Sequence, residues 1–191
     1  MNKEYWSDRY IRHNTKWDVG YAIPALTDYI DQLENKELKI LIPGCGHAYE
    51  ASYLFSKGFT NVYIADITEE PLNNFRERVP EFPKSHILIT DFFSINDTFD
   101  LIFEHTFFCA LDIKMRTSYI KKMHELLNLN GKLTGVLFSF PLTENGPPFG
   151  GDINEYKKLF LKHFQLIKIE NCKNSIKPRM SNELFFIAKP I

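Results

Sequence analysis

The sequence lacks closely spaced cysteines and long apolar runs. Its three cysteines, Cys45, Cys109 and Cys172, stand far apart, so they indicate neither a disulfide framework nor a close metal-ligand pair, and a reducing cytoplasm is the expected compartment. No stretch approaches the length of about 18 consecutive apolar residues that a membrane-spanning helix requires. Residues 1–18 contain no apolar segment typical of a secretory signal. We therefore expect neither secretion nor membrane insertion.

An excess of charge of one sign is also missing. The 191 residues contain 23 Lys and Arg against 24 Asp and Glu, for a formal net charge of −1. This balance argues against a surface that binds nucleic acid or membrane through net positive charge. Aromatic residues are abundant instead, with 17 Phe, 9 Tyr and 2 Trp, which is more than a core of this size needs.

Short apolar runs alternate with longer amphipathic stretches from Leu38 onward, a pattern typical of βαβ units. Strands are predicted at 38–43, 61–65, 86–89, 99–103, 131–138, 164–170 and 183–189, and helices at 48–57, 69–78, 113–128 and 152–162. Asp112 is the expected N-cap of the third helix. No helical period separates the last two strands, so we expect them to pair antiparallel.

The predicted fold class is therefore α/β. We expect a single Rossmann-like domain over residues 1–191, with about seven mostly parallel strands, an antiparallel last strand and helices on both faces of the sheet. Residues 36–191 would form the core, and residues 1–35 an N-terminal segment with a helix.

A glycine loop joins the first predicted strand to the first helix of this core. In residues 40–52 (ILIPGCGHAYEAS), Gly44 and Gly46 follow the strand, where an open α/β sheet binds its ligands and where glycine lets the backbone approach them closely. A dinucleotide fingerprint would need a third glycine where Tyr49 stands, and no GKS or GKT of a nucleoside-triphosphate loop is present. The loop predicts a pocket without naming its ligand.

Acidic and aromatic residues follow the next two strands. Asp66 comes about 20 residues after Gly46, the spacing at which a carboxylate meets ribose hydroxyls. Asp91 and Phe92 offer an acceptor for an exocyclic amine and an aromatic face for a purine. Singly, each residue is explained as well by a helix cap, a turn or the core. Together, at the ends of three successive strands, they predict a site for an adenosine without phosphates.

Trp6, Tyr10 and Trp17 precede the first strand at helical spacing. They could form a stripe that packs on the sheet, or a lid over the pocket. We favour the lid, because the alternative leaves two tryptophans on a chain terminus. The π faces of such rings attract a desolvated cation by about 0.5–2 kcal/mol each.

These motifs resemble the class I S-adenosylmethionine-dependent methyltransferases, and within them the thiopurine S-methyltransferase family in its thiol and halide methyltransferase branch. The resemblance extends from Trp6 to Lys189, and its most specific parts are WDVG at 17–20 and GPPF at 146–149. Its other parts are PGCG at 43–46, Asp66, DFF at 91–93, FDLIFEHTFFCAL at 99–111, and Met115–Arg116 with Tyr119.

The resemblance implies a cofactor, S-adenosylmethionine, which leaves as S-adenosylhomocysteine. The residues implied to hold it are Trp6, Tyr10, Trp17, Gly44, Gly46, Asp66, Asp91, Phe92 and His105. The resemblance also implies an arginine near the acceptor, for which Arg179 is the candidate. Aromatic and proline residues on loops after the fourth and fifth strands are expected beside the methyl group; they are Phe107, Phe108, Phe140, Pro147, Pro148 and Phe149.

Methyl transfer from a sulfonium is an in-line displacement that depends on positioning and needs no charged catalytic residue. We therefore assign no catalytic residue, and His105 is the one candidate base. No cluster of metal ligands is visible, and Cys45 and Cys109 lack the partner pattern of a covalent nucleophile. An acceptor that is already ionised fits best: a thiol, hydrosulfide, thiocyanate, halide or thiopurine.

The expected partner is thus a small-molecule acceptor, and we expect no binding to nucleic acid or membrane. We expect the protein to be a monomer, and a dimer is left open. Two alternatives remain at this stage. One is a non-catalytic protein that binds an adenosyl ligand, and the other is a nicotinamide-dependent oxidoreductase, which Tyr49 disfavours.

Overall fold

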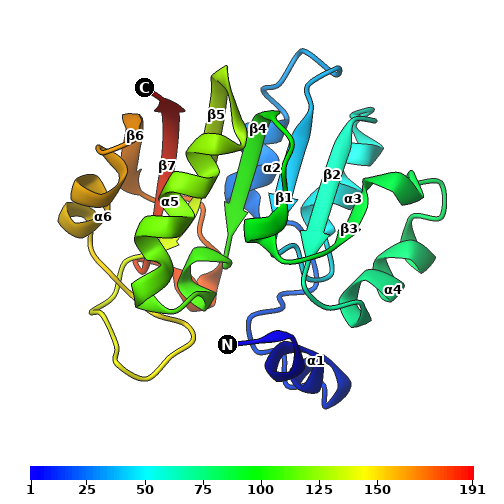
Figure 1. The fold of residues 1–191 in the computed structure, drawn as a ribbon, viewed down its shortest axis with the longest axis horizontal. Helices are drawn as coiled ribbons and strands as arrows, with labels where there is room; N and C mark the ends of the chain where they lie inside the picture. Colours follow the sequence, from blue (N-terminus) through cyan, green and yellow to red (C-terminus); the bar gives the residue numbers. More distant parts are fainter.

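The centre of the protein is a seven-stranded sheet with the order β3-β2-β1-β4-β5-β7-β6 (Figure 1). The structure is a computed structural model that describes residues 1–191. Neighbouring strands pair in parallel from β3 to β5, and β7 runs antiparallel to both β5 and β6. The strands are β1 (Ile40–Pro43), β2 (Val62–Asp66), β3 (Ile87–Ile89), β4 (Phe99–His105), β5 (Leu127–Phe138), β6 (Phe164–Asn171) and β7 (Glu183–Pro190). The predicted α/β sheet with an antiparallel last strand is confirmed.

Helices cover both faces of this sheet. The helices are α1 (Lys3–Ile11), α2 (Pro24–Ile30), α3 (Tyr49–Ser56), α4 (Glu70–Arg78), α5 (Arg116–Glu125) and α6 (Ile153–Phe160). Buried residues of α2, α3 and α4 pack on one face, and those of α5 and α6 pack on the other. None of the helices has the length and apolar character needed to cross a bilayer.

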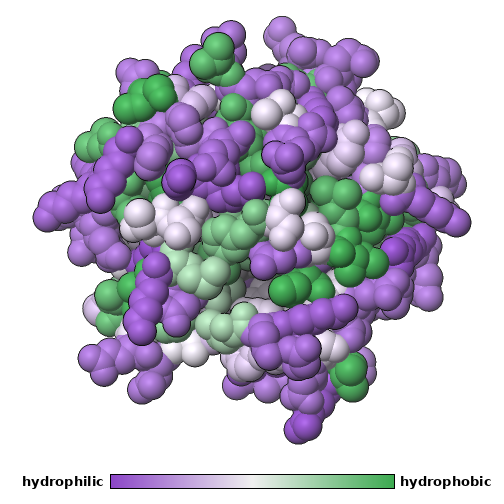
Figure 2. All heavy atoms as spheres, viewed as in Figure 1, coloured by the Kyte–Doolittle hydropathy of each residue, from purple (hydrophilic) through white to green (hydrophobic).

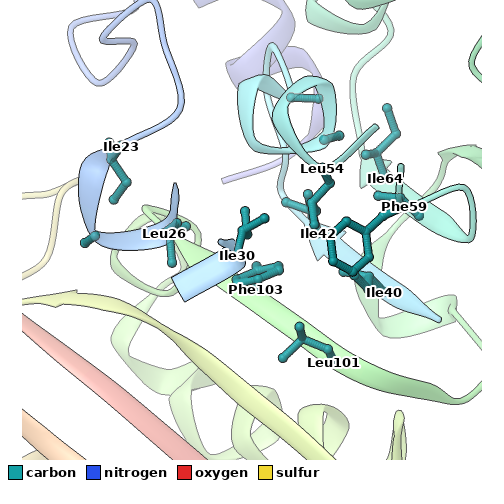
Figure 3. Close-up of a cluster of buried hydrophobic side chains, with 14 of the residues drawn as sticks. Ile23, Leu26, Ile30, Ile40, Ile42, Leu54, Phe59, Ile64, Leu101 and Phe103 are labelled. Atoms are coloured by element: carbon teal, nitrogen blue, oxygen red, sulfur yellow. The ribbon is translucent and has the colours of Figure 1, made fainter. Parts of the chain in front are cut away.

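The strands supply both cores because successive side chains of a strand point to opposite faces. Ile40 and Ile42 of β1 join the core beneath α2 and α3, whereas Leu41 joins the core beneath α5. Figure 3 shows the first of these cores, in which Phe103 of β4 lies near Ile30 of α2. Each fully buried side chain of this size stabilises the fold by about 1.5–3 kcal/mol, so the two cores fix the strand ends from which the site is built.

The helix predicted at 113–128 is shorter than the sequence indicates. Asp112 caps a 3₁₀ turn, Ile113–Met115, by accepting from the backbone N–H of Lys114 at 2.9 Å, and α5 begins only at Arg116. The helix also ends before the predicted residue 128, because Leu127 already pairs with Phe99 of β4. The apolar spacing continues past residue 125, but pairing with the neighbouring strand overrides it.

Two segments lie beyond the carboxyl ends of the parallel strands. Figure 1 shows α1 and the loop at residues 141–151 near this edge of the sheet, on either side of the end of β4. The carboxyl ends of β1, β2 and β4 meet here because the three strands are parallel neighbours. This edge is therefore where the predicted pocket must lie.

Candidate active site

A pocket of about 490 Å³ opens at this edge, within the range of roughly 300–1,000 Å³ of small-molecule sites. Figure 2 shows a hollow in this face of the molecule, with hydrophobic and hydrophilic residues side by side around it. All nine residues implied to hold the cofactor line the pocket: Trp6, Tyr10, Trp17, Gly44, Gly46, Asp66, Asp91, Phe92 and His105. Segments far apart in the sequence thus converge on one cavity.

The glycine loop forms the floor of the pocket. Gly44 and Gly46 have φ values of +58° and +51°, in the left-handed region that glycine adopts without strain. A Cβ atom on Gly44 would overlap the ring of Phe107. Glycine is therefore required at position 44 for two reasons, its backbone conformation and the close approach of an aromatic ring.

Asp66 ties this loop to the end of β2. Its Oδ2 accepts from the backbone N–H of Gly46 at 3.0 Å, and its Oδ1 accepts from the N–H and the hydroxyl of Thr68 at 3.0 and 2.8 Å. Burial raises the pKa of Asp66, and the hydrogen bonds from Thr68 and Gly46 partly offset that shift. Oδ2 keeps a free lone pair, so the carboxylate can accept a further hydroxyl in the pocket.

Asp91 and Phe92 follow β3, as the sequence predicts. Asp91 Oδ1 caps the 3₁₀ turn Phe92–Ser94 by accepting from the N–H of Phe93 at 2.9 Å. The Phe92 ring is largely buried, with centroid distances of 5.2 Å to Phe107 and 5.6 Å to Tyr119. Both residues line the pocket, so this corner offers a carboxylate oxygen beside an aromatic surface.

The N-terminal aromatics lie over the pocket. We call residues 3–20 the aromatic lid. The Trp17 ring makes edge contacts with Trp6 and Tyr10 at centroid distances of 5.4 and 5.7 Å. No residue of α1 is fully buried, so the helix does not pack on the sheet as a core stripe would. Burial, followed by the charge of Asp66, raises the pKa of Tyr10, which keeps its hydroxyl neutral above the glycine loop.

The residues predicted to contact the acceptor divide into two groups. Phe107, Pro147 and Pro148 line the pocket, and so does Phe138, which the sequence analysis did not single out. The other three aromatics, Phe108, Phe140 and Phe149, lie outside the lining.

Those three aromatics support the wall from behind. Phe108 is buried against Tyr119 and Tyr156, at centroid distances of 5.1 and 5.7 Å. Phe140 packs on Phe138 at 5.2 Å, and the N–H of Phe149 donates to the carbonyl of Cys109 at 2.8 Å. Their contact with an acceptor stays a prediction.

Glu104 is a buried residue of the site that sequence reasoning missed. Its Oε1 accepts from the N–H groups of Phe107 and Phe108 at 2.9 and 2.8 Å, and its Oε2 accepts from the Tyr119 hydroxyl. Burial raises the pKa of Glu104. The carboxyl group therefore fixes the turn that places Phe107 against Gly44. An acidic residue directly after the apolar run 101–103 (LIF) was the signal available in the sequence.

Two polar contacts that the sequence did not indicate hold the segments around the pocket. His47 Nε2 lies 3.3 Å from Asp18 Oδ2, which connects the glycine loop to the aromatic lid. Arg116 is buried and donates to the carbonyl of Gly150 at 2.6 Å and to Glu155 at 2.7 Å, which fixes the loop at 141–151. No three His, Cys, Asp or Glu side chains converge as metal ligands would.

Arg179 lies beside the site rather than in it. Its guanidinium group is absent from the pocket lining, but it contacts His105 and the carbonyl of Trp17, both of which belong to lining residues. The structure thus brings the predicted arginine close to the pocket, with another residue between it and the cavity.

Comparisons with known proteins identify the family of the chain. The family Thiopurine S-methyltransferase (TPMT) matches residues 1–186. Thiocyanate methyltransferase 1 of Arabidopsis thaliana is 29% identical, with 93% of this chain and 81% of that protein covered. Thiopurine S-methyltransferase of Photobacterium profundum is 23% identical, with 99% and 96% covered.

Among solved structures, a 1,6-didemethyltoxoflavin-N1-methyltransferase of Burkholderia thailandensis, with bound 1,6-didemethyltoxoflavin and S-adenosylhomocysteine, superimposes with a TM-score of 0.81. It is 15% identical, and the match covers 98% of this chain and 86% of that one. At this identity the likeness establishes the fold.

Proposed function

The chain belongs to the thiopurine S-methyltransferase family, and we propose that it transfers the methyl group of S-adenosylmethionine to a small, soft nucleophile such as a thiol, hydrosulfide, thiocyanate, halide or thiopurine. Family membership makes it an S-adenosylmethionine-dependent methyltransferase. One observation carries the proposal: the nine residues implied to hold the cofactor line a single pocket whose remaining wall is mainly apolar.

The residues of the pocket fit the parts of the cofactor. The free lone pair of the buried Asp66 carboxylate suits a ribose hydroxyl, and Asp91 with Phe92 suits an adenine amine and ring. Gly44 and Gly46 line the pocket, and without side chains their backbone can approach the methionine part closely. The aromatic lid supplies the π faces that attract a cationic sulfur.

The chemistry needs little beyond placement. S-adenosylmethionine supplies a methyl group on a positively charged sulfur, which an acceptor attacks from the opposite side. The chain orients the two reactants and excludes water, and alignment of this kind contributes as effective molarity. Phe107, Pro147 and Pro148 form an uncharged wall for the acceptor. A soft anion arrives without a proton to remove, so no general base is required.

The curated relatives support a sulfur acceptor. Their names include a thiocyanate methyltransferase and thiopurine S-methyltransferases, and both groups of substrates present a soft sulfur atom. The balanced charge of the chain supports a small molecule in place of a nucleic acid. The three free cysteines support a reducing compartment, for which we propose the cytoplasm.

An acceptor panel tests the proposal. The protein is incubated with S-adenosylmethionine that carries an isotope-labelled methyl group, together with hydrosulfide, thiocyanate, iodide, a small aryl thiol or a thiopurine, and methylated products are detected by mass spectrometry. We expect turnover of at least one sulfur acceptor. Calorimetry with S-adenosylhomocysteine completes the test: binding without any turnover would favour the non-catalytic alternative, and no binding at all would remove the cofactor assignment.

A further inference from the structure

A row of polar side chains borders the pocket, and two of its members, Glu50 and His105, line the cavity. Glu50 at the start of α3 lies 3.1 Å from His105 Nδ1 at the end of β4. The other ring nitrogen, His105 Nε2, lies 3.0 Å from Nη1 of Arg179. Arg179 belongs to the 3₁₀ turn Lys177–Arg179, and its Nη1 also lies 3.5 Å from Oε1 of Glu183. Glu50, Arg179 and Glu183 are 5%, 8% and 3% exposed, so these contacts are shielded from water.

The chemistry of arginine determines the form of the histidine. A guanidinium group has only N–H donors, so at 3.0 Å the Nε2 atom of His105 must be the acceptor and carries no proton. The proton of the neutral ring is then on Nδ1, where it donates to Glu50. Both nitrogens of His105 are thus engaged in hydrogen bonds. The ring could accept a proton from an acceptor molecule only by releasing Arg179.

The other end of the row reaches the aromatic lid. Nη2 of Arg179 donates to the backbone carbonyl of Trp17 at 2.7 Å. The indole of that same residue packs on Trp6 and Tyr10 above the pocket. A hydrogen bond from a charged donor is among the stronger kinds in proteins. Arg179 therefore links the lid to the carboxyl end of the sheet.

We propose that Arg179 is a positioning residue that holds the aromatic lid closed through the carbonyl of Trp17, and that His105, oriented by Glu50, aims the guanidinium group. The proposal rests on the proposed function in that the lid closes over the cofactor. It differs from the role implied by resemblance, in which the arginine meets the acceptor. Both terminal nitrogens of Arg179 are bound to protein groups, and its side chain is absent from the pocket lining.

The chain carries its own reporter for this lid. Trp6 and Trp17 are its only two tryptophans, and both belong to the lid. Acrylamide quenching of tryptophan emission therefore measures the accessibility of the lid in the ligand-free protein. Hydrogen exchange of the amides in residues 3–20 measures how often the same segment opens.

Three variants distinguish a role of Arg179 in holding the aromatic lid closed from a role in contacting the acceptor. Arg179→Met removes both donors, and Arg179→Lys keeps the positive charge beside Glu183 but lacks the planar fork that reaches His105 and Trp17 together. Arg116→Met is the matched control, because Arg116 is also buried and also donates to a carbonyl and a glutamate, but holds the loop at 141–151.

In both Arg179 variants we expect amide exchange in residues 3–20 to accelerate about tenfold. Tryptophan quenching should rise in parallel. S-adenosylhomocysteine should bind more weakly, and KM should rise for the cofactor more than for the acceptor. Arg116→Met should leave exchange in residues 3–20 at the wild-type rate. Should Arg179→Met fail to fold, Arg179→Lys, which retains the buried charge, decides the question.

The opposite pattern overturns the proposal. If exchange and quenching of the lid stay at wild-type values while KM for the acceptor alone rises, and if lysine restores that KM, then Arg179 is an acceptor contact that acts through its charge. These lid measurements need no ligand. If the wild-type protein binds no S-adenosylhomocysteine, the proposed function fails, yet the exchange data still decide whether Arg179 holds the lid.

Discussion

The backbone N–H of Gly46 donates a 3.0 Å hydrogen bond to Oδ2 of Asp66. The glycine loop after β1 and the carboxylate at the end of β2 therefore form one unit, although they come from different strands. β1 and β2 are parallel neighbours in register, with Pro43 opposite Ala65. The pocket floor is thus set by two neighbouring parallel strands, and a change at either residue reaches the other.

Asp66→Asn tests this unit. The substitution keeps the size of the side chain but replaces one carboxylate oxygen with an amide donor, which faces either Gly46 and the ribose or Thr68. We expect S-adenosylhomocysteine affinity, measured by calorimetry, to fall by about 1–3 kcal/mol. Asp97→Asn is the control, because that exposed residue pairs with Lys39 outside the pocket. Equal affinities for the wild type and Asp66→Asn would remove Asp66 from the site.

Gly44→Ala tests the close approach of Phe107. Alanine at a positive φ costs about 1–2 kcal/mol, and here the added methyl group would also overlap the Phe107 ring. Gly58→Ala is the matched control, since Gly58 has a φ of +85° and nothing within 4 Å of the added carbon. Both variants should lose stability to denaturant, but only Gly44→Ala should weaken S-adenosylhomocysteine binding. A similar loss of binding in both would mean that backbone strain alone matters.

The thiols that line the pocket should be unreactive. Burial raises the pKa of Cys45 and of Cys109, with further contributions from Asp66 and Glu104 respectively. Because the thiolate is the reactive form, a raised pKa leaves both residues protonated at neutral pH. We expect iodoacetamide to modify them at least about tenfold more slowly than free cysteine at pH 8, and faster as the pH rises.

Because the two thiols stay protonated, S-adenosylmethionine should not methylate Cys45 or Cys109. The intact mass should stay unchanged during incubation with S-adenosylmethionine. Urea-unfolded protein is the control for alkylation, and it should react at the rate of free cysteine. A methyl group found on Cys45 by peptide mapping would contradict the prediction.

Glu104→Gln should change how stability depends on pH. Burial raises the pKa of Glu104 in the folded protein, so the folded state holds this proton more tightly than the unfolded chain does. The stability from Glu104 is then fully present below its unfolded pKa and is lost as the pH rises through its folded pKa. The free energy of unfolding of the wild type, relative to Glu104→Gln, should therefore fall as the pH rises above about 4.3, the ordinary pKa of a glutamate.

Denaturant titrations at several pH values check this difference. Glu125→Gln, on the exposed side of α5, is the control and should track the wild type at every pH. A difference between the wild type and Glu104→Gln that stays constant across the range would mean that burial does not shift the titration of Glu104.

Local patterns were sufficient for the order of elements from β1 onward and for several residues that line the pocket. Alternating apolar runs indicated all seven strands, and Gly44, Gly46, Asp66 and Asp91 were placed by their position after a strand. These residues meet because parallel strands end at one edge of the sheet. That rule of topology can be applied to a sequence without coordinates.

Contacts between distant segments were beyond the sequence. The distant partners of Arg179 are His105 and Trp17, which lie in β4 and in the lid, and nothing local to IKPRMSNE indicates either. Phe108 and Phe107 are neighbours in the chain, yet one is core and the other lines the pocket. The start of β5 was missed because pairing of Leu127 with Phe99 outweighed a helical period.

The sequence by itself determined the α/β class, the glycine loop and the acidic residues after β2 and β3, because those depend on hydrophobic period and on position relative to a strand. Only the tertiary structure decided which aromatics face the cavity, how Glu104 fixes the turn beneath Phe107, and that Arg179 reaches the lid. Such contacts depend on the packing of side chains from separate elements, and each is set by distances that no spacing along the chain encodes.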